Sequence, residues 1–283
     1  MSDLPLAETP LRADAALARR PRLRLGIGKI TYVNKVAIAT SIGAILAWWL
    51  AAQLEVVPAM FLPSPLAVAM KLGSVWTEGF QDATLLQHLV ASLGRVTAAL
   101  AGAVVAGVVL GFAMNLSATA RGIIEPLLEI YRPIPPLAYL PLVIIWFGIG
   151  EGAKILVIFL GILPSIIIAT NEGLQTVSRD HVNAARSLGA THWQVVTRVW
   201  FPHALPSILT GTRIGLGTGW ATLVAAELVA ATRGLGFMIK GAADFLVTDV
   251  VILGILVIAF LAIVMEFALR FLQRVFTPWQ GRA

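Results

Sequence analysis

Three ionisable residues lie inside long apolar stretches of this sequence: Arg95, Arg213 and Glu227. An ionised side chain at the centre of a bilayer costs at least about 2.5 kcal/mol, so such residues are rare and usually pair or face a watery cavity. In a watery cavity, an arginine can bind an anion and a glutamate can bind a cation. Arg95, Glu227 and the nearby Arg233 are therefore candidates for lining or gating a transport path. The alternative is that the buried three reach the lipid headgroups.

The spacing of these charges limits their partners. Arg213 and Glu227 would lie about 21 Å apart on one helix, because a helix rises about 1.5 Å per residue. Each therefore needs a partner on another helix or a water-filled cavity. A proton relay would need a chain of Asp, Glu and His across the membrane, and the sequence has none, since its histidines fall in loops or near the ends of apolar stretches.

The common catalytic patterns are absent from the sequence. It contains no cysteine, so thiolate nucleophiles, thiolate metal sites and disulfides are excluded. It has no Gly-x-x-x-x-Gly-Lys-Ser/Thr loop for ATP, no His-Glu-x-x-His helix and no Gly-x-Ser-x-Gly turn. The remaining classes are a transporter driven by a partner's ATPase, a secondary transporter, an intramembrane enzyme and a structural membrane subunit.

The composition predicts the elements that carry these residues. Of the 283 residues, 58% are hydrophobic and only 13% are charged, and the mean hydropathy is +0.85. Soluble domains have about 45–50% apolar and about 25% charged residues. The sequence therefore predicts an all-α, polytopic membrane protein.

Apolar stretches near the length of about 20 residues that a spanning helix needs predict six transmembrane helices. The predicted spans are Val36–Leu54, Leu89–Leu116, Ile134–Ile149, Ile155–Thr170, Ser207–Ala230 and Val250–Leu272. The third and fourth are short and contain Pro141 and Pro164. We interpret them as two crossings rather than one hairpin, because long apolar stretches lie on both sides of the glycine-rich tip.

The placement of basic residues predicts the orientation. Most of the 21 Lys and Arg residues fall in the N-terminal segment, in the second and fourth connections, and near the C-terminus. The positive-inside rule then puts both termini in the cytoplasm. Residues 1–35 are predicted to be a cytoplasmic tail and residues 36–283 the membrane domain. The net charge of +6 is thus an orientation signal, and no nucleic-acid partner is expected.

Small residues recur every fourth position in two of the predicted spans, a pattern typical of closely packed membrane helices. The residues are Ala99, Ala103, Gly107 and Gly111 in the second span, and Gly211, Gly215 and Gly219 in the fifth. Tight packing is the plain interpretation. A second interpretation places Gly215 and Gly219 on a path or at a dimer axis.

The cytoplasmic connection at about residues 171–206 is predicted to fold into two short helices. Ser178 can cap the first helix, and Gly189 follows its end. Thr191 and Gln194 form a capping box for the second, which Pro202 is expected to end. Two capped amphipathic helices indicate a docking surface, with a helix pair on the membrane surface as the alternative.

This connection resembles the cytoplasmic signature of the permease subunits of bacterial ABC importers. In that family, Glu-Ala-Ala is followed after three residues by Gly, and after nine more by Ile-x-Leu-Pro. Here Ala184-Ala185, Gly189 and Val199-Trp200-Phe201-Pro202 have the same spacing. This sequence departs from the family pattern at Asn183, Val199 and Phe201, which replace the glutamate, isoleucine and leucine. Asn183 cannot form the salt bridge of the glutamate, but the docking role does not depend on that salt bridge.

Two further stretches resemble the nitrate, sulfonate and taurine branch of these permeases. They are Tyr131–Glu151, with its Arg-Pro-Ile-Pro-Pro and Trp-Phe-Gly-Ile-Gly-Glu sequences, and Gly219–Met238. The likeness covers about residues 55–280 and, through 244–250, is strongest to the taurine permeases. It implies import of taurine or a similar small alkanesulfonate across the bacterial inner membrane.

The resemblance also implies the machinery around the chain. A coupling segment would dock on a cytoplasmic ATPase; its residues are Asn183, Ala184, Ala185, Leu188, Gly189 and Pro202. Two permease copies, an ATPase dimer and one periplasmic binding protein are implied, together with membrane lipid. ATP and Mg would bind to the ATPase, so no cofactor or metal is expected in this chain, and it is not expected to be an enzyme.

Other substrates and another mechanism stay open from the sequence. A permease for nitrate, bicarbonate or other sulfonates would have the same signature. A proton-coupled secondary transporter is the alternative from another class. From charge alone, the sulfonate of taurine is expected to meet Arg95 and its ammonium group Glu227.

Overall fold

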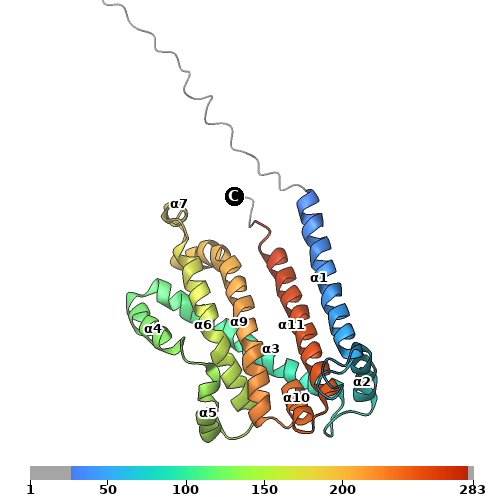
Figure 1. Ribbon diagram of the computed structural model, residues 1–283. Coiled ribbons are helices and arrows are strands. Elements are labelled where there is room, and N and C mark those ends of the chain that lie inside the picture. Colours follow the sequence, from blue (N-terminus) through green and yellow to red (C-terminus); the bar gives the residue numbers. More distant parts are fainter. Residues whose placement is uncertain (1–26, 280–283) are drawn as a thin grey trace, which may run out of the picture.

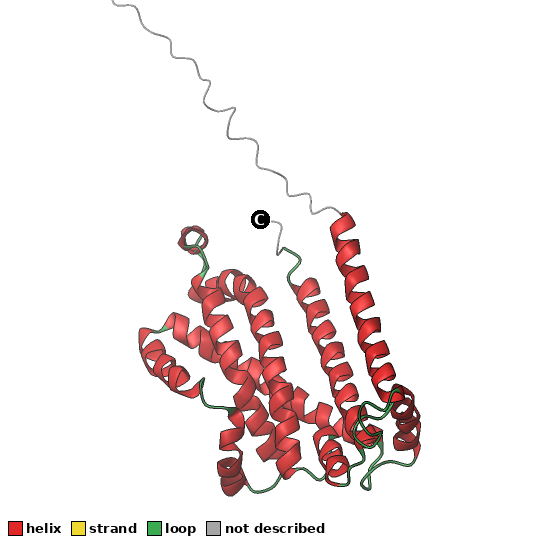
Figure 2. Ribbon diagram, viewed as in Figure 1, coloured by secondary structure: helices red, strands yellow, loops and turns green. Residues whose placement is uncertain are grey.

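The computed structural model describes residues 27–279, and this part of the chain is a bundle of helices without a strand (Figures 1 and 2). The elements are α1 (Ile27–Gln53), α2 (Pro65–Thr77), α3 (Leu85–Leu116), α4 (Ala118–Tyr131), η1 (Pro136–Tyr139), α5 (Leu140–Phe147), α6 (Glu151–Gln175), α7 (Arg179–Ser187), α8 (His192–Val195), η2 (Val196–Trp200), α9 (Phe201–Ala230), α10 (Leu235–Asp244) and α11 (Thr248–Phe276). The all-α prediction is confirmed.

The helices are consistent with several membrane crossings. Within residues 27–279, four are long and apolar enough to cross a bilayer, and the number rises to six if each of two bent helix pairs counts as one span. One pair joins α4 to η1 and α5 with a bend of 94°, and the other joins the α8–α9 segment to α10 with a bend of 53°. The multi-pass prediction is confirmed, and the count of six stays a prediction.

The predicted third span differs most from the structure. Within Ile134–Ile149 the continuous helical segment is η1 with α5, Pro136–Phe147, which is about 20 Å long against about 30 Å for the hydrocarbon core. Three prolines, Pro133, Pro135 and Pro136, separate α4 from α5. Each removes a backbone donor and restricts the preceding residue, so the apolar stretch bends sharply instead of running straight.

Helix α6 forms the centre of the bundle, with α3 and α9 packed along it (Figure 1). The largest core cluster joins side chains of these three helices, including Ala99, Ile162 and Leu216. Pro164 lies inside α6 without ending it. Helices α4 and α5 lie on one side of this centre, and α11 and α1 on the other (Figure 1).

Both small-residue ladders pack against α6. A Cβ atom added to Gly107 would lie 2.7 Å from the Ile166 side chain, and one added to Gly215 would lie 2.9 Å from Ile162. An added Cβ at Gly219 would also lie within 3 Å of Ile162. The ladders therefore let both α3 and α9 approach α6 closely, as the packing interpretation predicts.

The two ends of the bundle carry different elements, and we call them the α7 end and the α10 end. The start of α1, the end of α11 and the α7 segment lie at the α7 end, whereas α2, α5 and α10 lie at the other (Figure 1). Of the predicted tail, residues 1–26 lie outside the described residues. Residues 27–35 belong to α1, because a helix can extend beyond the apolar stretch that marks its span.

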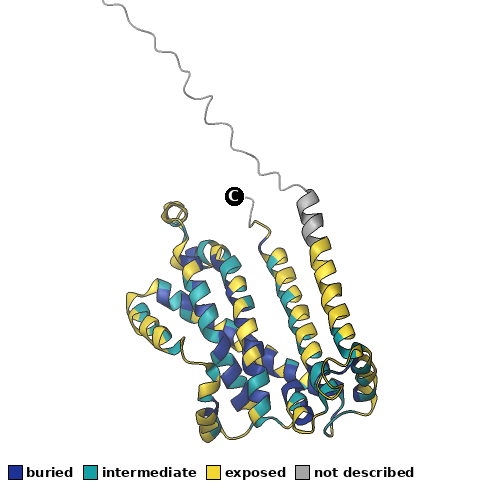
Figure 3. Cartoon of the chain, in the orientation of Figure 1, coloured by how far each residue is buried: buried dark blue, intermediate teal, exposed yellow. Residues whose placement is uncertain are grey.

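Helix α1 packs differently from the central helices. The apolar side chains of its described part are largely exposed (Figure 3), and the helix contacts α2 near its own end. The buried residues concentrate instead in α3, α6, α9 and α10 (Figure 3). This central group is the part of the molecule that positions the buried charges.

Candidate functional site

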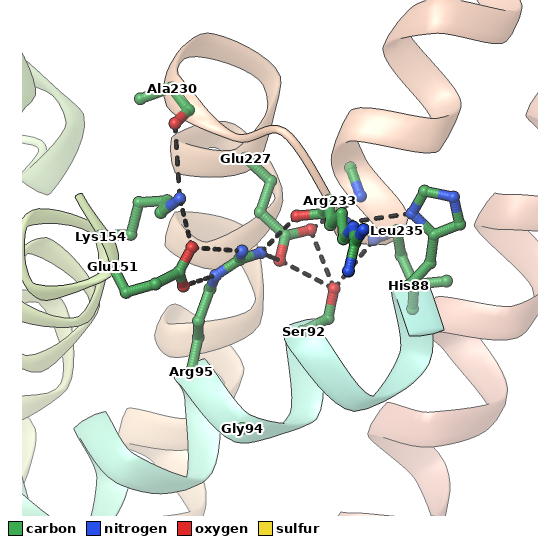
Figure 4. Close-up of polar contacts among 12 residues, drawn as sticks. His88, Ser92, Gly94, Arg95, Glu151, Lys154, Glu227, Ala230, Arg233 and Leu235 are labelled. Carbon is green, nitrogen blue, oxygen red and sulfur yellow. Dashed lines mark hydrogen bonds and ion pairs between the residues drawn. The ribbon is translucent and has the colours of Figure 1, made fainter. Parts of the chain in front are cut away.

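A cluster of charged side chains lies where α3, α6 and α9 meet at the α10 end (Figure 4). Arg95, Lys154 and Glu227 are buried, whereas the Glu151 side chain is 59% exposed. Arg95 of α3 is only 3% exposed. Its Nε and Nη2 donate to the two carboxylate oxygens of Glu151, at 2.6 and 2.9 Å. Its Nη1 donates to Glu227 at 2.6 Å and to the backbone carbonyl of Arg233 at 2.7 Å. One guanidinium thus links two helices and the connection after α9.

The carboxylate of Glu227 is satisfied on both oxygens. Besides Arg95, its Oε2 accepts from the backbone N–H of Gly236 at 2.8 Å. The Ser92 hydroxyl lies 2.8 and 3.0 Å from its two oxygens and accepts from the N–H of Leu235 at 2.9 Å. Glu227 is 1% exposed, so charge-assisted hydrogen bonds replace the water that an ionised carboxylate needs.

His88 extends the network by one layer. Its Nδ1 accepts from the N–H of Gly234 at 3.1 Å, and its Nε2 lies 3.0 Å from the carbonyl oxygen of Phe80. A ring nitrogen that accepts carries no proton, so these contacts assign a neutral imidazole with the proton on Nε2. The histidine therefore connects the start of α3 to the 231–236 connection without adding charge.

A second cation balances the cluster. Lys154 of α6 is 3% exposed; its Nζ lies 2.7 Å from Glu151 and 3.4 Å from the carbonyl of Ala230. Two cations and two carboxylates therefore meet in one site. Removing one member of a buried ion pair is strongly destabilising, whereas a complete set is tolerated.

The connection after α9 fits around Glu227 only because it contains glycine. Gly234 has φ of +136°, and a Cβ there would lie 2.5–2.6 Å from the Glu227 carboxylate. A side chain at Gly236 would meet the carbonyl of Val224 and the Cβ of Glu227. Both glycines allow the backbone N–H groups to approach the carboxylate, and this explains the Gly-Leu-Gly sequence.

The structure brings some predicted path residues together and separates others. Arg95 and Glu227 contact each other and are both buried within the bundle, so in this conformation neither is free to hold one end of a substrate. The Arg233 side chain lies apart from them, in an exposed hollow with Asp82 and Phe237. Gly215 and Gly219 face Ile162 of α6.

The sequence did not identify four members of the cluster as site residues: His88, Ser92, Glu151 and Lys154. Glu151 and Lys154 stand at the start of an apolar stretch, where end-of-span charges are common. Their i,i+3 spacing, which places side chains on one helix face, is the only signal of an ion pair. No local pattern indicates that this pair meets Arg95.

Arg213 belongs to a separate, more exposed cluster between α9 and α11. Its Nε donates to Glu266 at 3.0 Å, and Glu266 also accepts from Arg270 at 2.8 Å. Gln273 lies 3.3 Å from Arg213. The predicted need for a partner on another helix is confirmed for both Arg213 and Glu227.

The loop at the α7 end has the predicted caps. Ser178 accepts from the N–H of Asp180 at 3.2 Å, and the Thr191–Gln194 capping box is complete. Gly189 has φ of +84°, a left-handed conformation that favours glycine, and it turns the chain between α7 and α8.

The prediction that Pro202 ends the second helix is wrong. The chain continues through α8, a π-helical turn at η2, and on into α9. In η2 the N–H of Phe201 bonds to the carbonyl of Val196, five residues earlier. This wider turn accommodates a residue that lacks an N–H, so the helical path runs without a break from the loop into the bundle.

Most of the coupling segment predicted from the sequence is exposed, whereas Ala185 and Pro202 are half-buried. Leu188 is 89% exposed and Trp193 is 72% exposed, and Asn183 and Ala184 are exposed beside them. Large apolar side chains that gather on a surface mark an interaction site. Nothing in the described residues covers them.

Comparisons with known proteins agree with this architecture. The family model described as "Binding-protein-dependent transport system inner membrane component" matches residues 103–281. The taurine transport system permease protein of Escherichia coli (strain K12) is 53% identical over 87% of this chain and 90% of its own length. The putative aliphatic sulfonates transport permease protein of the same organism is 34% identical over 84% of this chain and 89% of its own.

A solved structure shares the fold. An inward-facing crystal form of the methionine ABC transporter MetNI superposes with a TM-score of 0.58 at 22% identity. The alignment covers 68% of this chain and 96% of that one. The fold is therefore that of an ABC transporter permease.

Proposed function

The chain belongs to the family of binding-protein-dependent transport system inner membrane components, and we propose that it moves taurine, or a similar small alkanesulfonate, across that membrane. As a permease subunit it is a transport component and not an enzyme, and it acts with an ATPase and a substrate-binding protein. The observation that supports taurine as the substrate is the 53% identity to a taurine permease over 87% of this chain. Other aliphatic sulfonates are the second candidate, supported by the 34% identical relative.

The α7 end is proposed to face the cytoplasm and to dock on the ATPase. The coupling residues Asn183–Gly189 are largely exposed there, and the rigid path from α8 through η2 into α9 supports transmission of the ATPase movement. Both chain termini would then be cytoplasmic, because the described ends lie at the same end of the bundle (Figure 1). ATP and Mg would bind only to the partner.

The buried cluster is proposed to hold the α10 end closed. It ties α3, α6 and α9 together where the periplasmic binding protein would deliver its substrate. Outward opening would then require Arg95 to exchange at least one of its carboxylate partners. A second copy of the chain would complete the path, as in the assembly that the family resemblance implies.

Transport in proteoliposomes tests the proposal. The permease is reconstituted with its ATPase, and the binding protein is added outside with radiolabelled taurine. We expect uptake that requires ATP inside the vesicles and is lost when the binding protein is omitted. Uptake that persists without the ATPase but follows an imposed proton gradient would contradict the proposal.

Substrate competition separates the two candidate substrates. Excess unlabelled taurine and excess unlabelled long-chain alkanesulfonate are each added to the same assay. Stronger competition by taurine supports a taurine importer. Stronger competition by the longer sulfonate would place the chain with the aliphatic sulfonate permeases.

A further inference from the structure

A cavity of about 330 Å³ lies between α6, α9 and the connection from α4 to η1. This volume is within the range of about 300–1,000 Å³ that is typical of small-molecule sites. On α6 the lining residues recur every fourth position from Leu160 to Glu172, which corresponds to a groove about 18 Å long on one face of the helix. Ile214 and Thr218 of α9 form the opposite wall.

The cavity contains one residue of each charge, and neither is neutralised. Arg132 comes from the connection after α4 and Glu172 from α6. Neither side chain takes part in an ion pair or hydrogen bond with the described residues, and both residues are exposed. This contrasts with Arg95 and Glu227, whose hydrogen-bonding groups are occupied by each other and by neighbouring groups.

Neutral polar groups lie between apolar ones along the wall. Tyr131, Ser165 and Thr218 supply hydroxyls, and Leu160, Ile168 and Ile214 supply hydrocarbon. The Tyr131 phenol oxygen is buried and has no hydrogen-bond partner among the described residues. A buried polar group without a partner is costly, and a ligand oxygen would relieve that cost after a small movement.

From this arrangement we propose that the cavity is a transient binding site for a zwitterion with an ammonium group at one end and a sulfonate at the other. Arg132 holds the sulfonate, since a guanidinium suits bidentate oxyanion recognition. Glu172 holds the ammonium group, and the apolar wall contacts the carbons between them. The inference deepens the proposed function and rests on it, because it takes an aminoalkanesulfonate as the substrate.

The proposal moves substrate recognition away from the buried cluster. A site that must release its ligand benefits from exposed, unneutralised charges that bind weakly. The buried cluster would have to lose several internal hydrogen bonds before it could accept a substrate. The two regions therefore have different roles: the buried cluster closes the α10 end, and the cavity binds the substrate.

Equilibrium binding of radiolabelled taurine to the detergent-solubilised permease–ATPase complex tests the site. Ethanesulfonate, which lacks the ammonium group, and ethylamine, which lacks the sulfonate, serve as competitors. In the wild type we expect taurine to bind at least about tenfold more tightly than either, because each charge-assisted contact is worth about that factor. Glu172→Gln should abolish the preference over ethanesulfonate. Arg132→Gln should abolish the preference over ethylamine.

Matched substitutions outside the cavity provide the controls. Glu266→Gln and Arg270→Gln remove the same charges from the α9–α11 cluster. Both should keep the wild-type preference, whereas Tyr131→Phe should weaken taurine binding severalfold.

The outcomes separate the site from the function. If the wild-type transporter imports taurine but the cavity variants bind and transport it as the wild type does, the cavity proposal is overturned and the function stands. If the wild type imports no taurine, the proposed function falls, and with it the zwitterion as ligand. Loss of preference in the control variants would also overturn the site, because the effect would not be local to the cavity.

Discussion

The buried cluster at the α10 end and the loop at the α7 end differ in how they accommodate groups that are costly in their surroundings, namely charges inside the bundle and apolar side chains on its surface. In the cluster, Arg95, Lys154, Glu151 and Glu227 are drawn together until each charge has an opposite partner within the same chain. In the loop, Leu188 and Trp193 stay exposed although both are apolar. The ion pairs of the first region are complete in one chain, whereas nothing in the described residues covers the apolar side chains of the second.

This difference indicates that the cluster contributes to the free energy of folding and the loop to the free energy of association. A complete buried network loses much stability when one charge is removed, so it should govern folding and closure of the α10 end. An exposed apolar surface contributes a favourable free energy only when a partner covers it and removes it from water. Substitutions in the loop should therefore change association and leave the fold intact. The predictions below test this separation.

The largest effect is expected for Glu227→Ala. It leaves Arg95 buried with one carboxylate partner fewer and removes the acceptor for the N–H of Gly236. Breaking a buried pair costs about 3–5 kcal/mol, so the melting temperature in detergent should fall steeply. Glu227→Gln keeps the shape and should lose less. If Glu227→Ala melts at the wild-type temperature, the cluster does not hold the bundle together.

The next largest effect is expected for Leu188→Glu, measured as affinity for the ATPase. A hot-spot side chain contributes about 2 kcal/mol or more to binding, which corresponds to a loss of about thirtyfold in affinity. The melting temperature of the isolated permease should not change, since Leu188 is 89% exposed. Normal ATPase binding by this variant would show that the exposed loop is not the docking surface.

The sequence predicted the loop better than the cluster, and the reason is physical. Caps and left-handed glycines depend on a few neighbouring residues, so Ser178, Gly189 and the Thr191–Gln194 box could be identified from local spacing. The small-residue ladders likewise repeat within one helix. In contrast, the Arg95–Glu151 and Arg95–Glu227 pairs join residues far apart in the sequence, and only the packing of three helices brings them together.

Prolines explain the remaining errors in the fold. The sequence treated 134–149 as a span separate from the segment before it, but three prolines at 133, 135 and 136 bend the chain by 94° between α4 and η1. Pro202 was expected to end a helix, and a π-helical turn carries the helix past it. A proline can break, bend or be accommodated, and only the surrounding packing decides which occurs.

A smaller effect is expected for Thr191→Ala, which removes one half of the capping box at the start of α8. Loss of an N-cap costs about 1 kcal/mol. Because α8 continues into α9, we expect the loss to appear as faster amide hydrogen exchange in α8 and η2, with little change in the core of α9. Equal acceleration along all of α9 would show that the loop and the bundle are not separable units.

The smallest effect is expected for Glu266→Gln, the exposed counterpart of Glu227→Gln. Glu266 pairs with Arg213 and Arg270, but its side chain is 31% exposed, so headgroups and water can replace its partners. Exposed pairs contribute about 0–1 kcal/mol, and the melting temperature should fall only slightly. The two glutamine variants remove the same charge from helices that contact each other, so they isolate the effect of burial. A loss as large as that of Glu227→Gln would show that charge pairing in general, rather than burial, stabilises this bundle.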